Sequence, residues 1–159
     1  MRETERTYDF ENRLIEFAVR IIKIAEALLK TPVGRHIAGQ IIRSGTSPAA
    51  NYGEAQRAES RADFIHKIKI CLKELRETKV WLMIIKSGNL CKTFAAGKDL
   101  TDETDQLISI FVASVKTARR NQKNPSYLNF AKFRYFNIMI LFPHIRKSTI
   151  LTGQCPTFS

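Results

Sequence analysis

The side chains that could do chemistry are densest in one stretch, RSGTSPAANYGEAQ, residues 43–56. The stretch combines small hydroxyls with an amide and a carboxylate: Ser44, Thr46, Ser47, Asn51 and Glu54. Such groups can supply a nucleophile with its base, bind a phosphate, or hydrogen-bond one another where two helices pack. Each alternative requires different neighbours, so the surrounding sequence can distinguish them.

The catalytic alternatives lack essential residues. A nucleophile elbow needs G-x-S-x-G, and Gly45-Thr-Ser47-Pro-Ala49 lacks the second glycine. A phosphate loop needs G-x-x-x-x-G-K-[ST], but Gln40 and Ile41 follow the candidate glycines. A Ser-His-Asp set would need His36, His66 or His144 to approach through an arrangement that no local pattern predicts. We therefore expect no catalytic residue, and the chain is predicted not to be an enzyme.

The cysteines predict neither a metal site nor a disulfide framework. Cys71, Cys91 and Cys155 are odd in number, widely spaced, and form no C-x-x-C pair. We expect no metal and no cofactor.

Treated as a helix, the same stretch has a regular pattern. Polar and small side chains recur at i, i+4, i+7, i+11 and i+14, at Gln40, Ser44, Ser47, Asn51 and Glu54. This polar seam predicts close packing against a neighbouring helix, with the polar groups buried and bonded to one another. Pro48 is expected to kink the helix, and Ser47 can cap the second half if the break is complete. Direct contact with RNA or a ligand remains the alternative.

Positive charge is the second functional signal. The net charge is +11, which favours an acidic partner, nucleic acid first and an anionic membrane second. A basic stripe, defined by Lys69, Lys73 and Arg76, follows i, i+4, i+7 spacing on one predicted helix face. Further cations lie near the seam, at Arg43, Arg57 and Arg61. These six residues are the candidate nucleic-acid contacts, and phosphate contacts of this kind provide affinity without sequence specificity. A solvated face with local ion pairs, such as Lys73 with Glu77, is the alternative.

The hydrophobic periodicity predicts an all-α fold, an antiparallel up-down four-helix bundle in residues 1–120. The expected helices span residues 10–30, 33–57, 60–86 and 101–120. Phe17 and Phe64 fall on their apolar faces and are predicted core residues.

End signals place the helix boundaries. Asp9, Ser60 and Thr101 are the expected N-caps, and Ser60 with Asp63 has capping-box spacing. Thr31 and Pro32 are expected to stop the first helix, and Gly88 to supply a left-handed residue after the third.

Two apolar faces are wider than one neighbour requires. The first helix carries a second apolar flank that includes Ile15 and Val19. The third helix is apolar all round at residues 80–85, VWLMII. Faces of this kind are covered on more than one side, so we expect a second subunit to provide the cover.

The composition changes after Arg120. Residues 121–159 contain no Asp or Glu and are rich in aromatic residues, around NFAKFRYFNIMILFP. This extension could be a helix that docks on the bundle, a segment that binds a membrane or a partner, or translated sequence that has not been selected to fold. Conflicting local signals favour the last. The charged N-terminus is not a signal peptide, and no apolar run approaches the ~20 residues of a membrane span, so we expect a cytoplasmic protein.

With these residues in view, the sequence RSGTSPAANYGEAQRAESRADFIHKIKICLKELRETKVWL, residues 43–82, closely resembles a family signature. The family is the four-helix-bundle proteins encoded in 23S ribosomal RNA intervening sequences, formerly labelled S23 ribosomal proteins. The resemblance covers about residues 8–120 and rests on the following residues: Arg43, Ser44, Thr46, Ser47, Asn51, Glu54, Asp63, Phe64, Lys73, Glu74, Glu77 and Trp81.

The resemblance implies an up-down bundle assembled as a homopentameric ring with a central channel. It implies no catalytic role, and it places Trp81 in the core or in a subunit interface. The family is similar in architecture to retroelement accessory proteins that bind reverse transcriptase and RNA, so a protein-interaction scaffold is the alternative to an RNA-binding protein. The family pattern ends near Arg120, and the extension departs from it.

Overall fold

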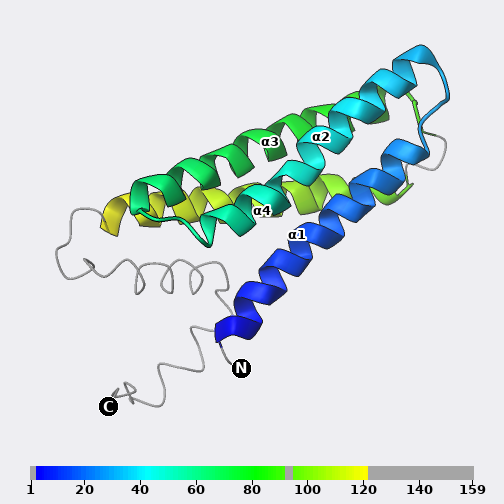
Figure 1. Ribbon diagram of the computed structural model, residues 1–159. Coiled ribbons are helices and arrows are strands. Elements are labelled where there is room, and N and C mark those ends of the chain that lie inside the picture. Colours follow the sequence, from blue (N-terminus) through cyan, green and yellow to red (C-terminus); the bar gives the residue numbers. More distant parts are fainter. Residues whose placement is uncertain (1–2, 92–94, 122–159) are drawn as a thin grey trace, which may run out of the picture.

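The structure, a computed structural model, describes residues 3–91 and 95–121 and is helical over most of that length. Four helices follow one another: α1 Glu3–Glu26, α2 Pro32–Ala55, α3 Arg61–Ser87 and α4 Ala95–Asn121. Successive helices run in opposite directions, with α1 packed on α2, α2 on α3 and α3 on α4 (Figure 1). The predicted all-α bundle is confirmed. Residues 122–159 of the expected extension lie outside the described residues.

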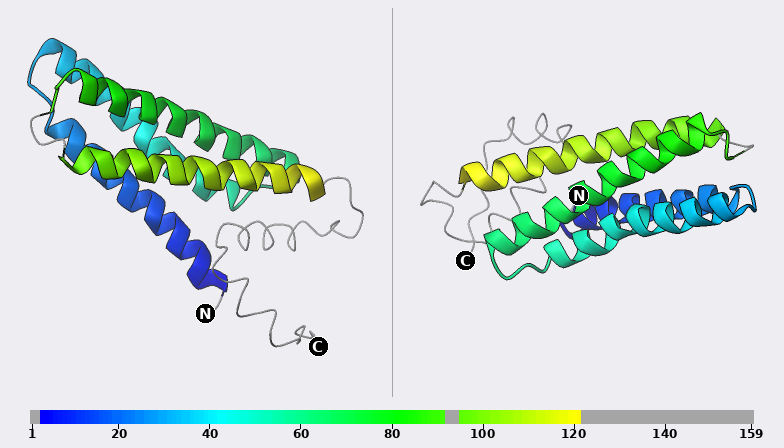
Figure 2. Two further views of the ribbon diagram at one scale, coloured as in Figure 1. Left: turned by 180° about the vertical axis from the view of Figure 1, so that it is seen from behind. Right: turned by 90° about the horizontal axis from the view of Figure 1, so that it is seen from above.

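The core forms where the apolar stripes of the helices face inward. Leu14, Phe17 and Ile21 of α1 and Phe64 of α3 are all buried. Phe10, Tyr52 and Phe111 bring α1, α2 and α4 together, with ring centroids 5.0 to 6.0 Å apart in edge-on contacts. α1 and α4 meet over a shorter stretch than the other neighbouring pairs, as the views in Figure 2 show.

The expected end of the first helix was wrong. α1 ends at Glu26, not at residue 30, because the chain after it pairs with the segment that follows α3. The Leu29 amide donates to the Leu90 carbonyl at 3.0 Å, and Leu28 forms an isolated bridge with Cys91. α1 also begins before Asp9, so Asp9 is not its N-cap.

The α3 boundaries are partly as predicted. The Ser60 side chain accepts a hydrogen bond from the Asp63 amide at 3.1 Å and caps α3. At the other end, Gly88 has a right-handed φ of −84°, and Asn89 takes the left-handed conformation with φ 50°. The Leu90 amide donates to the Ile85 carbonyl at 3.1 Å. This six-to-one bond identifies a Schellman motif shifted by one residue from the expected position.

Three further expectations on the helices need correction. α2 continues through Pro48 without a break, so Ser47 does not cap a second segment. Thr31 does not stop the preceding helix, which ends at Glu26; its side chain accepts from the Gly34 amide at 3.0 Å and caps α2. α4 begins at Ala95, and Thr101 therefore lies inside the helix.

Candidate nucleic-acid interface and polar seam

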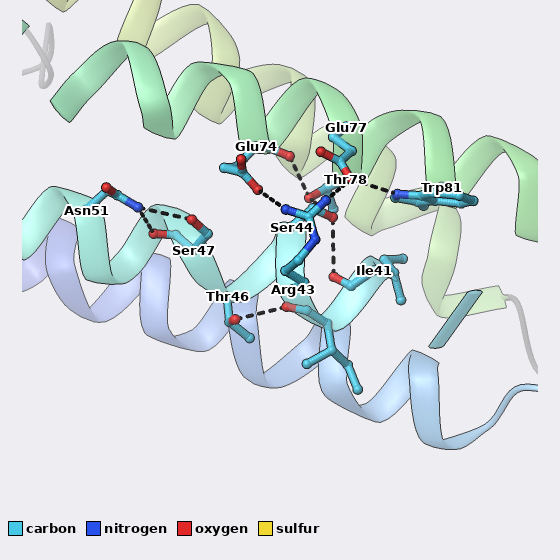
Figure 3. A network of polar contacts seen from close by, with 11 residues as sticks. Ile41, Arg43, Ser44, Thr46, Ser47, Asn51, Glu74, Glu77, Thr78 and Trp81 are labelled. Carbon is cyan, nitrogen blue, oxygen red and sulfur yellow. Dashed lines mark hydrogen bonds and ion pairs between the residues drawn. The ribbon is translucent and has the colours of Figure 1, made fainter. Parts of the chain in front are cut away.

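The buried part of the polar seam is a hydroxyl pair between α2 and α3. The oxygens of Ser44 and Thr78 lie 3.0 Å apart in a hydrogen bond, and both residues are 0% exposed. The Thr78 oxygen also lies 2.9 Å from the Glu74 carbonyl oxygen of its own helix. When its single hydrogen is donated to Glu74, Thr78 accepts from Ser44. Figure 3 shows the pair between the two helices. Each hydroxyl therefore has a partner, as a buried polar group requires.

The remaining seam residues do not form one buried network. Asn51 donates to the Ser47 carbonyl and hydroxyl, both at 3.0 Å, and Thr46 donates to the Ile42 carbonyl at 2.9 Å. These are bonds within α2 (Figure 3). The Glu54 side chain is 59% exposed and pairs with Lys67 of α3, which raises the pKa of Lys67. The predicted continuous buried network was thus wrong in extent, because only one of the five positions meets α3 below the surface.

Arg43 joins α2 to α3 through two carboxylates. Its guanidinium donates to Glu74 at 3.2 Å and also to Glu77. The Glu74 side chain is 8% exposed, so Arg43 supplies the charge partner of a nearly buried carboxylate. Trp81 is only half-buried, and its indole nitrogen donates to Glu77 at 3.3 Å (Figure 3).

This arrangement changes the expected roles of these residues. Glu77 pairs across the helices with Arg43, whereas local spacing suggested Lys73. Because two carboxylates compensate Arg43, it is a poor candidate for phosphate contact, contrary to the prediction. Trp81 lies at the border of the core and stacks edge-on to His36, with centroids 6.5 Å apart.

The basic stripe is exposed as expected. Lys69, Lys73 and Arg76 are all solvent-exposed on α3, and none of them makes an ion pair with any residue that the structure describes. Along α3, which is described throughout, no exposed position from Ala62 to Val80 carries an acidic side chain. Uncompensated cations on one helix face produce a positive potential toward solvent.

Arg57 and Arg61 lie at the turn between α2 and α3, beyond the stripe. Arg57 is exposed and donates to the Gly53 carbonyl at 3.3 Å, and Arg61 is half-buried at the first residue of α3. A backbone bond leaves the charge of Arg57 uncompensated, so it can extend the positive surface toward this end of the bundle.

The packing of α4 against α3 brings a further cation, Lys116, level with the basic stripe. Spacing along the sequence could not show this. Lys79 of α3 is paired with Asp105 of α4 at 2.6 Å, which fixes the level of the two antiparallel helices. Exposed Lys116 lies about three turns beyond Asp105 along α4. Lys69 lies about three turns before Lys79 along α3, so Lys69 and Lys116 are level. Only the helix register reveals that these two cations lie at the same level.

The described residues contain no helix long and apolar enough to cross a membrane and no cluster of His, Cys, Asp or Glu that could hold a metal ion. Cys71 is buried and its thiol lies 3.5 Å from the Pro48 carbonyl. Burial raises the pKa of the Cys71 thiol to about 12, which suppresses the reactive thiolate.

Comparison with known proteins identifies a family and a similar solved structure. The sequence model described as 23S rRNA-intervening sequence protein matches residues 6–113. A similar solved structure is that of a protein with unknown function from the S23 ribosomal protein family of Bacteroides thetaiotaomicron VPI-5482. It is 32% identical, covers 70% of this chain and 98% of its own, and superposes with a TM-score of 0.63. No curated protein matches the chain.

Proposed function

Because the chain belongs to the 23S rRNA-intervening sequence protein family, we propose that it is a cytoplasmic, homo-oligomeric bundle that binds RNA or DNA without catalysing a reaction. The contacts are electrostatic and are made through the exposed basic face of α3.

The observation that carries this proposal is the basic stripe. Lys69, Lys73 and Arg76 are exposed, follow one face of α3, and have no acidic partner within the described part of the chain. Arg43 and Lys67, by contrast, are both engaged by carboxylates. The fold thus leaves a row of free cations on an outer helix face, where a phosphate backbone can approach.

Such a surface favours affinity over sequence specificity. Lys and Arg contacts to phosphates release condensed counterions, so binding weakens steeply as salt rises. Base-specific recognition needs side chains that reach base edges. Repetition of the stripe in each subunit of a homo-oligomer multiplies the number of phosphate contacts on one nucleic acid.

The polar seam supports the non-enzymatic part of the proposal. The Ser44 hydroxyl is fully buried against Thr78. Asn51 hydrogen-bonds Ser47, and Glu54 pairs with Lys67. A nucleophile needs a free hydroxyl beside a base, and these groups are occupied by bonds within α2 or between α2 and α3.

The mass of the full chain in solution tests the proposal. Light scattering is measured with and without a 23S-derived RNA, at rising salt. We expect an assembly of about five subunits that gains the mass of RNA at low salt and loses it at high salt. An assembly that ignores RNA would favour the alternative, a scaffold for a protein partner. A monomer would overturn the homo-oligomeric part.

A further inference from the structure

Two exposed apolar strips remain on opposite helices of the bundle. The α1 strip is Ile15 and Val19, 47% and 44% exposed, one turn apart. The α3 strip is Val80, Met83 and Ile84, 54%, 54% and 39% exposed, within one turn and continuing the face of the basic stripe. Single exposed hydrophobic side chains are ordinary, but groups at helical spacing form surfaces suited to packing against another protein.

The net charges of the exposed residues beside the two strips are of opposite sign. Glu16 and Glu26, both exposed, flank the α1 strip, and Arg76 and Lys86, both exposed, flank the α3 strip. Each pair is separated by ten positions in the chain. When the two helices run antiparallel, this equal spacing brings Glu16 level with Lys86 and Glu26 level with Arg76. The same register places Val19 of the α1 strip level with Met83 of the α3 strip. Lys23 is the other exposed charge on this stretch of α1.

The positions of the strips define the type of contact. α1 and α3 are diagonal in the bundle, because α2 packs between them on one side and α4 contacts both (Figure 2). One chain therefore cannot join its own two strips. Because the matching surfaces differ, a contact between copies is heterologous, and it repeats until the assembly closes as a ring or extends as a filament.

We propose that the α1 strip of one copy packs antiparallel against the α3 strip of a second copy, with Glu16 opposite Lys86 and Glu26 opposite Arg76. In the assembly Arg76 then belongs to this interface, and Lys69 and Lys73 remain for phosphate contact. The proposal rests on the homo-oligomeric state proposed above and assigns its interface. Opposite charges fix which surfaces meet and their register, while the apolar strips supply the buried area.

Two double variants of the full chain test this assignment by mixing. Ile15→Ser/Val19→Ser disables the α1 strip, and Val80→Ser/Met83→Ser disables the α3 strip. All four residues are exposed, so the helical content measured by circular dichroism should be unchanged. Each variant alone is expected to be monomeric by light scattering. An equimolar mixture should form dimers with twice the monomer mass, because one intact strip of each kind remains.

Charge reversal provides a second test of the same contact. Glu16→Lys/Glu26→Lys should reduce the assembled mass, and addition of Arg76→Glu/Lys86→Glu in the same chain should restore it. The matched control Val33→Ser/Ile42→Ser, at exposed apolar positions of α2, should leave the mass unchanged.

The outcomes separate this inference from the proposed function. If the wild-type chain assembles but the strip variants keep its mass, or the mixture stays monomeric and charge reversal has no effect, the assigned interface is wrong while the homo-oligomer stands. If the wild-type chain is monomeric, both the interface and the homo-oligomer are wrong.

Discussion

Two glycines of α2 provide a matched test of how the bundle packs. Gly39 and Gly45 both lie inside the helix, but their surroundings differ. A Cβ atom added at Gly39 would meet nothing within 4 Å, whereas one added at Gly45 would lie 2.6 Å from Cγ2 of Ile21 on α1. Ile21 is 0% exposed, so it has no free space into which to move. The same substitution should therefore have opposite consequences at the two sites.

The size of each effect follows from these surroundings. Alanine is favoured over glycine in a helix interior by about 0.5–1 kcal/mol, so Gly39→Ala should raise the free energy of unfolding by that amount. Gly45→Ala gains the same helix propensity but overpacks the contact with Ile21, which costs about 1–3 kcal/mol. Since the propensity gain is common to both, the difference between the variants should equal the overpacking cost.

Urea unfolding followed by circular dichroism, at one fixed protein concentration, measures both variants against the wild type. A fixed concentration is required because self-association shifts the apparent stability. Equal free energies of unfolding for Gly39→Ala and Gly45→Ala would refute the close approach of α1 to α2 at Gly45.

Three further predictions concern the contacts between α2 and α3. Thr78→Val should lower the free energy of unfolding by about 1–3 kcal/mol, because the Ser44 hydroxyl loses its close partner. The double variant with Ser44→Ala should lose less free energy of unfolding than the sum of the two single variants. Additive losses in urea unfolding would contradict the hydroxyl pair. Arg43→Ala should lower the free energy of unfolding by about 1–3 kcal/mol, because it leaves the Glu74 carboxylate without a charge partner. Adding Glu74→Gln should recover part of that loss. No recovery would argue against the ion pair. Burial raises the pKa of Cys71 from 9.0 to about 12, so above pH 9 only the unfolded thiol ionises and the free energy of unfolding falls by up to ~1.4 kcal/mol per pH unit. The fall should be shallower by that amount in Cys71→Ala, and identical pH profiles would contradict the burial.

The four helices and their inward faces could be predicted because hydrophobic periodicity is a local signal. The Ser60 cap was predictable for the same reason, since its bonding partner lies three residues away. The end of α1 was not predictable, because it depends on backbone pairing with residues 90 and 91 across the bundle.

In the candidate site, too, local features could be predicted from the sequence and contacts between helices could not. Exposure of the basic stripe follows from its position opposite the apolar face of α3. The partners of Arg43 do not follow from the sequence. Whether Glu77 pairs with Lys73 or with Arg43 depends on how closely α2 and α3 pack. The level of Lys116 with Lys69 likewise requires the helix register.

The most direct test of the nucleic-acid proposal is a charge reversal with a matched control. Lys69→Glu/Lys73→Glu alters two cations of the basic stripe, and Lys30→Glu/Arg35→Glu alters two exposed cations near the start of α2 by the same net charge. Both are compared with the wild type for binding to a labelled single-stranded 23S-derived RNA over a range of salt concentrations. We expect only the stripe variant to bind weakly, with the slope of log affinity against log salt reduced by about 0.7 for each phosphate that the variant no longer neutralises. Equal losses of affinity in the two variants, or none in either, would contradict the claim that the outer face of α3 is the binding surface.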